Sequence, residues 1–128
     1  MSFTHKITHE LQIGSETLLN EQTLSGNGRQ SISETIADST TDGLVAFALD
    51  VSECASFFIL ADQALTVKTN SSGSPADTLT LSAGVPYLWH TGAIDSFQLG
   101  TDVTALYVTN ASGEDATLRI EALYDPTA

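Results

Sequence analysis

Three histidines are the residues whose type and spacing come closest to those of a metal site. His5 and His9 are four positions apart in a stretch of alternating apolar and polar residues. On a strand this spacing places both side chains on one face but about 13 Å apart, which is too far for them to share a metal ion. His90 lies far along the chain beside Trp89, so a zinc site would require the fold to bring it to the N-terminal strand. We therefore predict surface or half-buried histidines, no metal site and no cofactor.

Nucleophilic and acid–base catalysis find little support in the sequence. The chain has no G-x-S-x-G pattern and no serine flanked by histidine, which are the arrangements that activate a serine. Its sixteen acidic residues leave a paired-carboxylate hydrolase open as an alternative, although most of them fall at predicted turns and strand ends. The only cysteine, Cys54, lies close to Phe57 and Phe58 and is predicted to be a buried apolar side chain. We predict no catalytic residues and no enzymatic activity.

An aromatic group offers a different kind of site. Tyr87 and Trp89 share one face of a predicted strand, and Phe97 follows in the next loop. Exposed aromatic rings of this kind stack on sugars in carbohydrate-binding modules. Packing between two sheets is the favoured interpretation, because aromatic residues on central strands normally fill the core.

The elements that would position these residues are strands. From Gly43 onward the chain consists of short apolar and β-branched segments separated by turn residues, with no amphipathic stretch long enough for a helix. Turns recur about every 8 to 12 residues, which is typical of sandwiches and jelly rolls. We predict an all-β fold, an antiparallel two-sheet sandwich resembling a jelly roll, that forms one domain over residues 1–128.

The N-terminal part has a different character. Phe3, Ile7, Leu11 and Ile13 alternate with polar residues, which predicts a half-buried strand. Residues 1–43 are also more polar than the rest of the chain and could act as an arm or an edge strand. Two interpretations stay open: these four residues contact a partner, or they complete the domain's own sheet.

Two local turns are predicted as well. Ser25 to Gly28 contains two glycines and an asparagine, a composition typical of a turn with positive φ. Thr104 to Asn110 and Ala116 to Tyr124 are predicted to pair as a hairpin with Gly113 at its tip.

Charge excludes several classes of partner. The formal net charge is −12, and the four basic residues are too widely spaced to form a stripe, so nucleic acid and anionic membrane surfaces would repel the chain. The N-terminal residues lack the apolar region of a secretory leader, and the longest apolar run, Phe57 to Ala61, is too short to span a bilayer. We expect a soluble protein.

Five segments together resemble small virion proteins of tailed bacteriophages. The similarity covers about residues 44 to 122 and is a pattern of strands and turns without a catalytic signature. The segments are, in order, Ala48 to Ser52 (ALDVS), Phe58 to Gln63 (FILADQ), Leu65 to Ser71 (LTVKTNS), Ala83 to Trp89 (AGVPYLW) and Leu106 to Ala111 (LYVTNA).

The resemblance implies a structural component of a phage particle, most simply a capsid decoration (cement) protein that is made in the host cytoplasm and lies on the exterior of the head. Its partner would then be the major capsid protein, and we expect a homo-oligomer, with a trimer favoured. On this hypothesis the N-terminal strand is the contact element, through Phe3, Ile7, Leu11 and Ile13. The alternative is a carbohydrate-binding or fibre-tip module of a phage head or tail, which would use Tyr87, Trp89 and Phe97.

Overall fold

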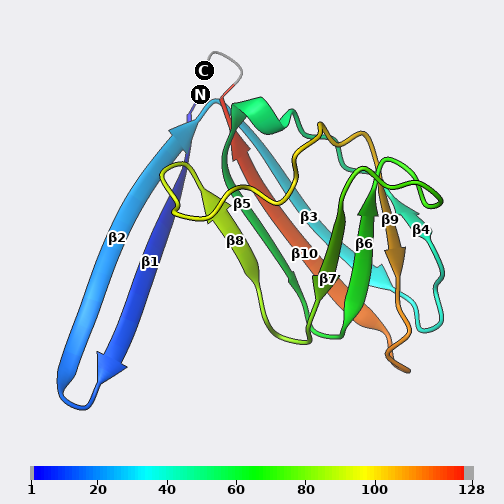
Figure 1. The fold of residues 1–128 in the computed structure, drawn as a ribbon, viewed down its shortest axis with the longest axis horizontal. Coiled ribbons are helices and arrows are strands. Elements are labelled where there is room, and N and C mark those ends of the chain that lie inside the picture. The colour runs from blue at the N-terminus through cyan, green and yellow to red at the C-terminus, as the bar shows by residue number, and fades with distance from the viewer. Residues whose placement is uncertain (1, 126–128) are drawn as a thin grey trace.

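The computed structural model describes residues 2–125, whose ordered elements are ten β-strands and one short 3-10 turn (Figure 1). In chain order they are β1 (Phe3–Ile13), β2 (Glu16–Gly26), β3 (Gly28–Ile36), β4 (Gly43–Val45), η1 (Val51–Glu53), β5 (Cys54–Ala61), β6 (Leu65–Thr69), β7 (Thr78–Leu81), β8 (Tyr87–His90), β9 (Leu106–Thr109) and β10 (Ala116–Tyr124).

Eight of the strands form a sandwich of two antiparallel sheets. One sheet has the order β3-β10-β5-β8 and the other the order β4-β9-β6-β7. Most consecutive strands lie in opposite sheets, so the chain wraps around the core, and this strand order is that of a jelly roll. The predicted all-β antiparallel sandwich is confirmed.

The core lies between the two sheets and follows from the period-two alternation of their strands. In β10, Leu118 and Ile120 point inward and are fully buried, while Arg119 between them is exposed. In the adjacent β5, Phe57 and Ile59 do the same. Burying a large apolar side chain completely contributes roughly 1.5–3 kcal/mol relative to exposing it, so these central strands supply much of the stability of the sandwich.

The connection between β9 and β10 differs from the prediction. β9 pairs with β4 and β6, whereas β10 pairs with β3 and β5, so the two strands lie in opposite sheets and the predicted hairpin is wrong. Asn110 stabilises the connection where the chain crosses from one sheet to the other. It is fully buried, and its side-chain amide donates to the carbonyls of Ile36 (3.0 Å) and Glu114 (2.8 Å). Two strands with one apolar face each can pair edge to edge or face each other across a core, and alternation alone does not distinguish these cases.

β1 and β2 stand apart from the sandwich as a two-stranded sheet of their own. They pair along their full length, from Phe3 opposite Gly26 to Ile13 opposite Glu16. Gly14, at the first position of the two-residue turn, has a φ of 59°, a conformation that glycine adopts at little cost. Figure 1 shows this hairpin leaving one corner of the sandwich and diverging from it toward its free end.

The joint between hairpin and sandwich lies at two glycines. A Cβ atom on Gly26 would lie 2.5 Å from the carbonyl oxygen of Tyr124, and one on Gly28 would lie 2.0 Å from the Tyr124 ring. The chain passes from β2 to β3 through a bend at Asn27, within the predicted turn at Ser25 to Gly28, but neither glycine has a positive φ, so the predicted backbone conformation is wrong. These positions need glycine because two segments approach each other closely there.

Candidate functional site

The half of the hairpin that lies near the joint packs on the outer face of the sheet that contains β10, β5 and β8. A ring nitrogen of His5 lies 2.9 Å from the hydroxyl of Ser56. Ile7 is 6% exposed and Leu123 is fully buried, although neither belongs to the core between the sheets. The Arg29 guanidinium lies 5.6 Å from the centre of the Phe3 ring, within the range of a cation–π contact. The sandwich thus holds the base of the hairpin through a small interface of its own.

The surroundings of His5 in this interface favour its neutral form. Burial lowers the pKa of His5, the nearby Glu121 carboxylate opposes this shift, and Arg29 adds to it. Desolvation disfavours the charged imidazolium. The docked hairpin therefore favours the neutral ring, which can share a hydrogen bond with the Ser56 hydroxyl.

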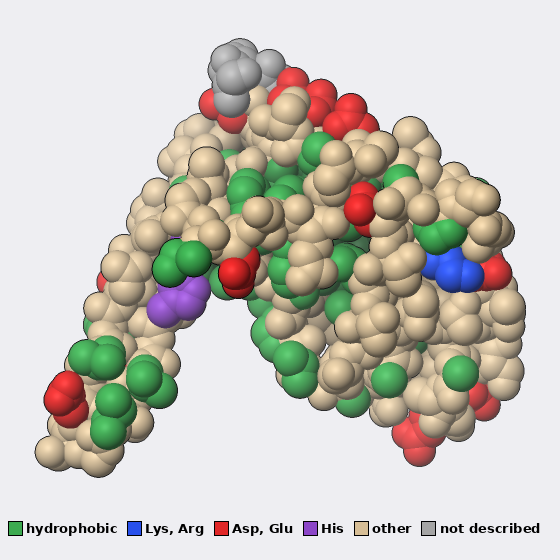
Figure 2. All heavy atoms as spheres, viewed as in Figure 1, with side chains coloured by type: hydrophobic (Ala, Val, Ile, Leu, Met, Phe, Trp, Pro, Cys, Tyr) green, Lys and Arg blue, Asp and Glu red, His purple; other side chains and the backbone are tan. Residues whose placement is uncertain are grey.

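The half of the hairpin that lies toward its free end is uncovered. Every residue from 8 to 20 is exposed, and four of them are large apolar residues with exposed fractions of 51–61%. We call these four residues the apolar tip: Leu11, Ile13, Leu18 and Leu19. In Figure 2 apolar side chains gather at the free end of the hairpin.

The apolar tip continues the buried stripe of the hairpin base. Leu11 and Ile13 have the same parity on β1 as Ile7, and Leu18 lies directly opposite Leu11 on β2, so these side chains share one face. Leu19 lies on the other face, opposite Glu10. One face of a continuous ribbon is thus buried by the chain itself near the base and left open toward the free end.

The structure separates the four residues that the sequence suggested as an interface. Phe3 and Ile7 contact the sandwich of their own chain, whereas Leu11 and Ile13 remain exposed. The sequence interpretation overlooked Leu18 and Leu19. Gly14 followed by Ser15 was the signal that could have identified them, because a Gly-Ser pair between two strand patterns is typical of a two-residue hairpin turn.

All three histidines of the chain lie near the contact between hairpin and sandwich. The rings of His9 and His90 have their centres 5.7 Å apart. The Nδ1 atom of the buried His90 lies 2.9 Å from the Thr91 carbonyl oxygen, which fixes Nδ1–H as the donor of that hydrogen bond. Among residues 2–125, no group of three or more histidine, cysteine or acidic side chains is arranged to hold a metal ion.

The three aromatic residues come together at the edge of the core. Trp89 and Phe97 stack almost in parallel with ring centres 4.5 Å apart, and both Phe97 and Tyr87 contact Phe57. The indole N–H of Trp89 donates to the Asp95 carbonyl oxygen, and the Tyr87 hydroxyl accepts from the backbone of Gln98. One face of the Trp89 ring is thus covered by Phe97, and the group fixes the loop over the core.

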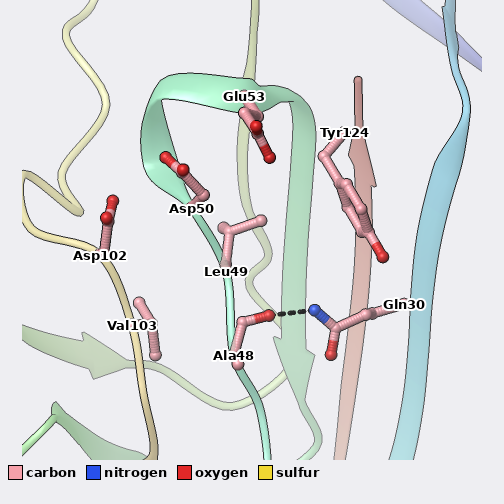
Figure 3. Close-up of a pocket in the computed structure, with 8 residues that line it drawn as sticks. All are labelled: Gln30, Ala48, Leu49, Asp50, Glu53, Asp102, Val103 and Tyr124. Carbon is pink, nitrogen blue, oxygen red and sulfur yellow. Dashed lines mark hydrogen bonds between the residues drawn. The ribbon is translucent and has the colours of Figure 1, made fainter. Parts of the chain in front are cut away.

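A shallow hollow of about 280 Å³ lies at one end of the sandwich, and three acidic residues, Asp50, Glu53 and Asp102, form part of its lining (Figure 3). Asp50 caps η1 and accepts from the backbone and hydroxyl of Ser52, and the Ser52 hydrogen bond lowers the pKa of the Asp50 carboxyl group. Asp102 accepts from the backbone of Val51. Gln30 donates to the Ala48 carbonyl across the hollow. Asp50 and Asp102 are thus engaged in holding loops, and the lowered pKa of Asp50 is the opposite of what a general acid requires.

Cys54 is buried, as its sequence context predicted. Desolvation raises the pKa of its thiol to about 12. Because the thiolate is the reactive form, this cysteine is unreactive near neutral pH.

Comparison of the chain with protein-family models, curated proteins and solved structures yields no match. Within the described residues, no helix has the length and apolar character needed to cross a membrane. The geometry of the hairpin is therefore the main basis for a functional proposal.

Proposed function

We propose that this chain is a structural protein of a bacteriophage particle, and specifically a capsid decoration protein that binds the exterior of the assembled head and stabilises it. The observation that carries the proposal is the combination of a jelly roll that has its own buried core with a projecting hairpin whose end is apolar and uncovered. The resemblance of residues 44 to 122 to small phage virion proteins supports the same conclusion.

A decoration protein needs a stable body and an attachment element. Such a protein stabilises a shell by binding the assembled lattice more tightly than its free subunits, so it acts through buried area and not through chemistry. Here the sandwich has its own complete core, and the outer half of the hairpin adds an apolar surface that the sandwich does not need for folding. We therefore propose that the hairpin joins copies of the protein into the oligomer that binds the shell.

The charge of the chain fits an exterior position. A net charge of −12 opposes contact with densely packed DNA inside a head, because the phosphates repel acidic side chains. The outer surface of a shell imposes no such constraint. We therefore propose the major capsid protein as the partner, and a homo-oligomer, with a trimer favoured, as the form that binds it.

Electron microscopy of phage particles assembled with and without this protein tests the proposal. We expect additional density on the outside of the head when the protein is present, and greater resistance of the head to heat. A Leu11→Asp, Leu18→Asp variant should reduce occupancy. A Leu44→Asp, Val85→Asp variant adds the same charge at apolar residues that are at least as exposed and should bind normally. Heads whose density and heat resistance do not change would refute the proposal.

A further inference from the structure

The apolar tip is a sheet face that the chain leaves without a partner. Leu11, Ile13 and Leu18 lie on the face that the hairpin base buries through Ile7. An isolated two-stranded hairpin is only marginally stable in water, and exposed apolar residues that gather in one place normally mark an interaction surface. Something outside this chain's own fold must cover this face if the outer half is to be stable.

The hairpin and the sandwich enclose an open groove that offers such cover. Near the base, a hollow of about 400 Å³ is lined by Ile7 and Thr8 on the hairpin and by Phe58 and Leu88 on the outer face of β5 and β8. A larger hollow of about 740 Å³ lies between His9 and Asn20 of the hairpin and the segment from Pro86 to Gln98, and it shares Leu88 with the first hollow. We call these two hollows together the hairpin groove. Figure 2 shows an open notch between the hairpin and the sandwich.

We infer that the occupant of the hairpin groove is the apolar tip of a second copy of this chain. The groove already accepts this kind of surface, because the base of the chain's own hairpin packs on the same outer face of β5 and β10. The outer half of the hairpin, about six residues per strand, spans roughly 20 Å, which is long enough to enter the groove of a neighbouring copy. The proposed contact is thus a continuation of the interface at the hairpin base.

The charges at this surface set a condition on the association. Two molecules that each carry −12 repel each other at long range. The outer hairpin carries two acidic residues, Glu16 on the face of Leu11 and Leu18 and Glu10 on the opposite face. The hairpin groove is lined by one basic residue, Lys6, and by two acidic residues, Glu121 and Asp95. The contact is therefore stabilised by apolar burial against a net repulsion, and salt, which screens this repulsion, should strengthen it.

The position of Leu19 agrees with insertion into a groove. Leu19 is 61% exposed and lies on the opposite face from Leu11 and Leu18. A hairpin end that enters a groove is enclosed on both faces, so apolar residues are useful on both. A hairpin end that lay flat on a surface would bury one face only.

The mass of the purified full chain in solution, measured by light scattering and sedimentation over a range of concentrations, tests this inference. We expect a defined multiple of the 13.5 kDa monomer. The Leu11→Asp, Leu18→Asp variant should raise the dissociation constant more than about 100-fold, because it places charges in an apolar contact. The Leu44→Asp, Val85→Asp variant is the matched control and should associate as the original chain does.

Cross-linking between two different variants tests the geometry. A chain with Leu18→Cys is mixed with a chain with Leu88→Cys, and a disulfide between them should form readily if the apolar tip lies in the neighbour's groove. Buried Cys54, with a pKa of about 12, should not react. Controls that pair Leu44→Cys with Leu88→Cys should give no such product.

A chain that stays monomeric at all concentrations, or an oligomer that the tip variant leaves intact, would overturn the inference. Loss of head binding by the tip variant of a monomeric chain would mean that the tip contacts the shell, so that the proposed function would stand and self-association would not. An oligomer held by the tip that binds no heads would support self-association and refute the proposed function.

Discussion

The sandwich and the hairpin are built from the same kind of element but differ in how they are stabilised. In the sandwich each strand buries one face against the opposite sheet, and residues such as Ile59 and Leu118 have no exposed surface. In the hairpin only the half near the joint is covered in this way, whereas every residue from 8 to 20 is exposed and the ring contact of His9 with His90 leaves the apolar tip open. The contrast indicates that the sandwich provides stability and the hairpin provides a surface for binding.

The change from buried to exposed apolar residues occurs within a single strand of the hairpin. β1 keeps the same alternation from Phe3 to Ile13, yet the exposed fraction of its apolar residues rises from 6% at Ile7 to 57% at Leu11. A sequence under selection only for the stability of the isolated chain would place polar residues at the free end. We interpret the persistence of apolar residues there as a requirement of assembly.

Truncation of a core residue should give the largest difference between the two regions. Ile120→Ala removes a fully buried side chain at the centre of β10 and should lower the free energy of unfolding by about 2–5 kcal/mol. Leu18→Ala in the apolar tip should change it by less than about 0.5 kcal/mol in the monomer. Urea unfolding followed by Trp89 fluorescence measures both variants. Equal losses would show that the hairpin end is part of the cooperative core.

A change at the joint should have an intermediate effect. Gly26→Ala places a Cβ atom 2.5 Å from the Tyr124 carbonyl oxygen, so the end of β2 must move away from β10, at a cost of about 1–3 kcal/mol. Gly73→Ala is the matched control, because its Cβ would have no neighbour within 4 Å and its φ is not positive. Amide chemical shifts should change along β1 and β2 in the Gly26→Ala variant only. A variant with the shifts and stability of the original chain would contradict the close packing at the joint.

The sequence predicted the sandwich better than the hairpin, and the reasons are physical. Alternation in segments such as Leu65 to Thr69 indicates strands that bury one face, and this information is almost sufficient to predict a sandwich. Alternation does not report which strand lies beside which, so β9 and β10 were predicted to pair although Asn110 directs the chain into the other sheet.

For the candidate site, the sequence identified the apolar face of β1 but not where its cover ends. Phe3, Ile7, Leu11 and Ile13 look equivalent in the sequence. The divergence of the hairpin from the sandwich separates half-buried Phe3 and buried Ile7 from exposed Leu11 and Ile13. The contribution of Leu18 depends on the hairpin register, which the turn at Gly14 sets.

Acidification should have the smallest effect, and it should act on the hairpin base. The pKa of His5 is lowered from its ordinary value of 6.5 in the docked hairpin, so a released hairpin binds a proton more readily. Docking is therefore fully stabilised above pH 6.5 and loses this contribution as the pH falls through the lowered pKa of His5. Glu121 and Arg29, the charged groups that act on His5, shift this pKa in opposite directions.

Amide exchange at the hairpin base, measured from pH 7.5 downward and corrected for intrinsic exchange, checks this prediction. His5→Asn keeps a polar side chain near Ser56 and should flatten the pH dependence, whereas His9→Asn leaves the His5 contact in place and should retain it. An unchanged profile in the His5→Asn variant would assign the effect to another group.

Residue-resolved hydrogen exchange of the full chain, compared between dilute and concentrated solutions, tests the central claim most directly. We predict that amides of residues 8–20 exchange quickly in dilute solution and become protected on concentration, while those of β5 and β10 are protected in both. Residues 8–20 that are as protected as β10 in the dilute monomer, or that gain no protection on concentration, would contradict the assignment of the hairpin end as the surface for assembly.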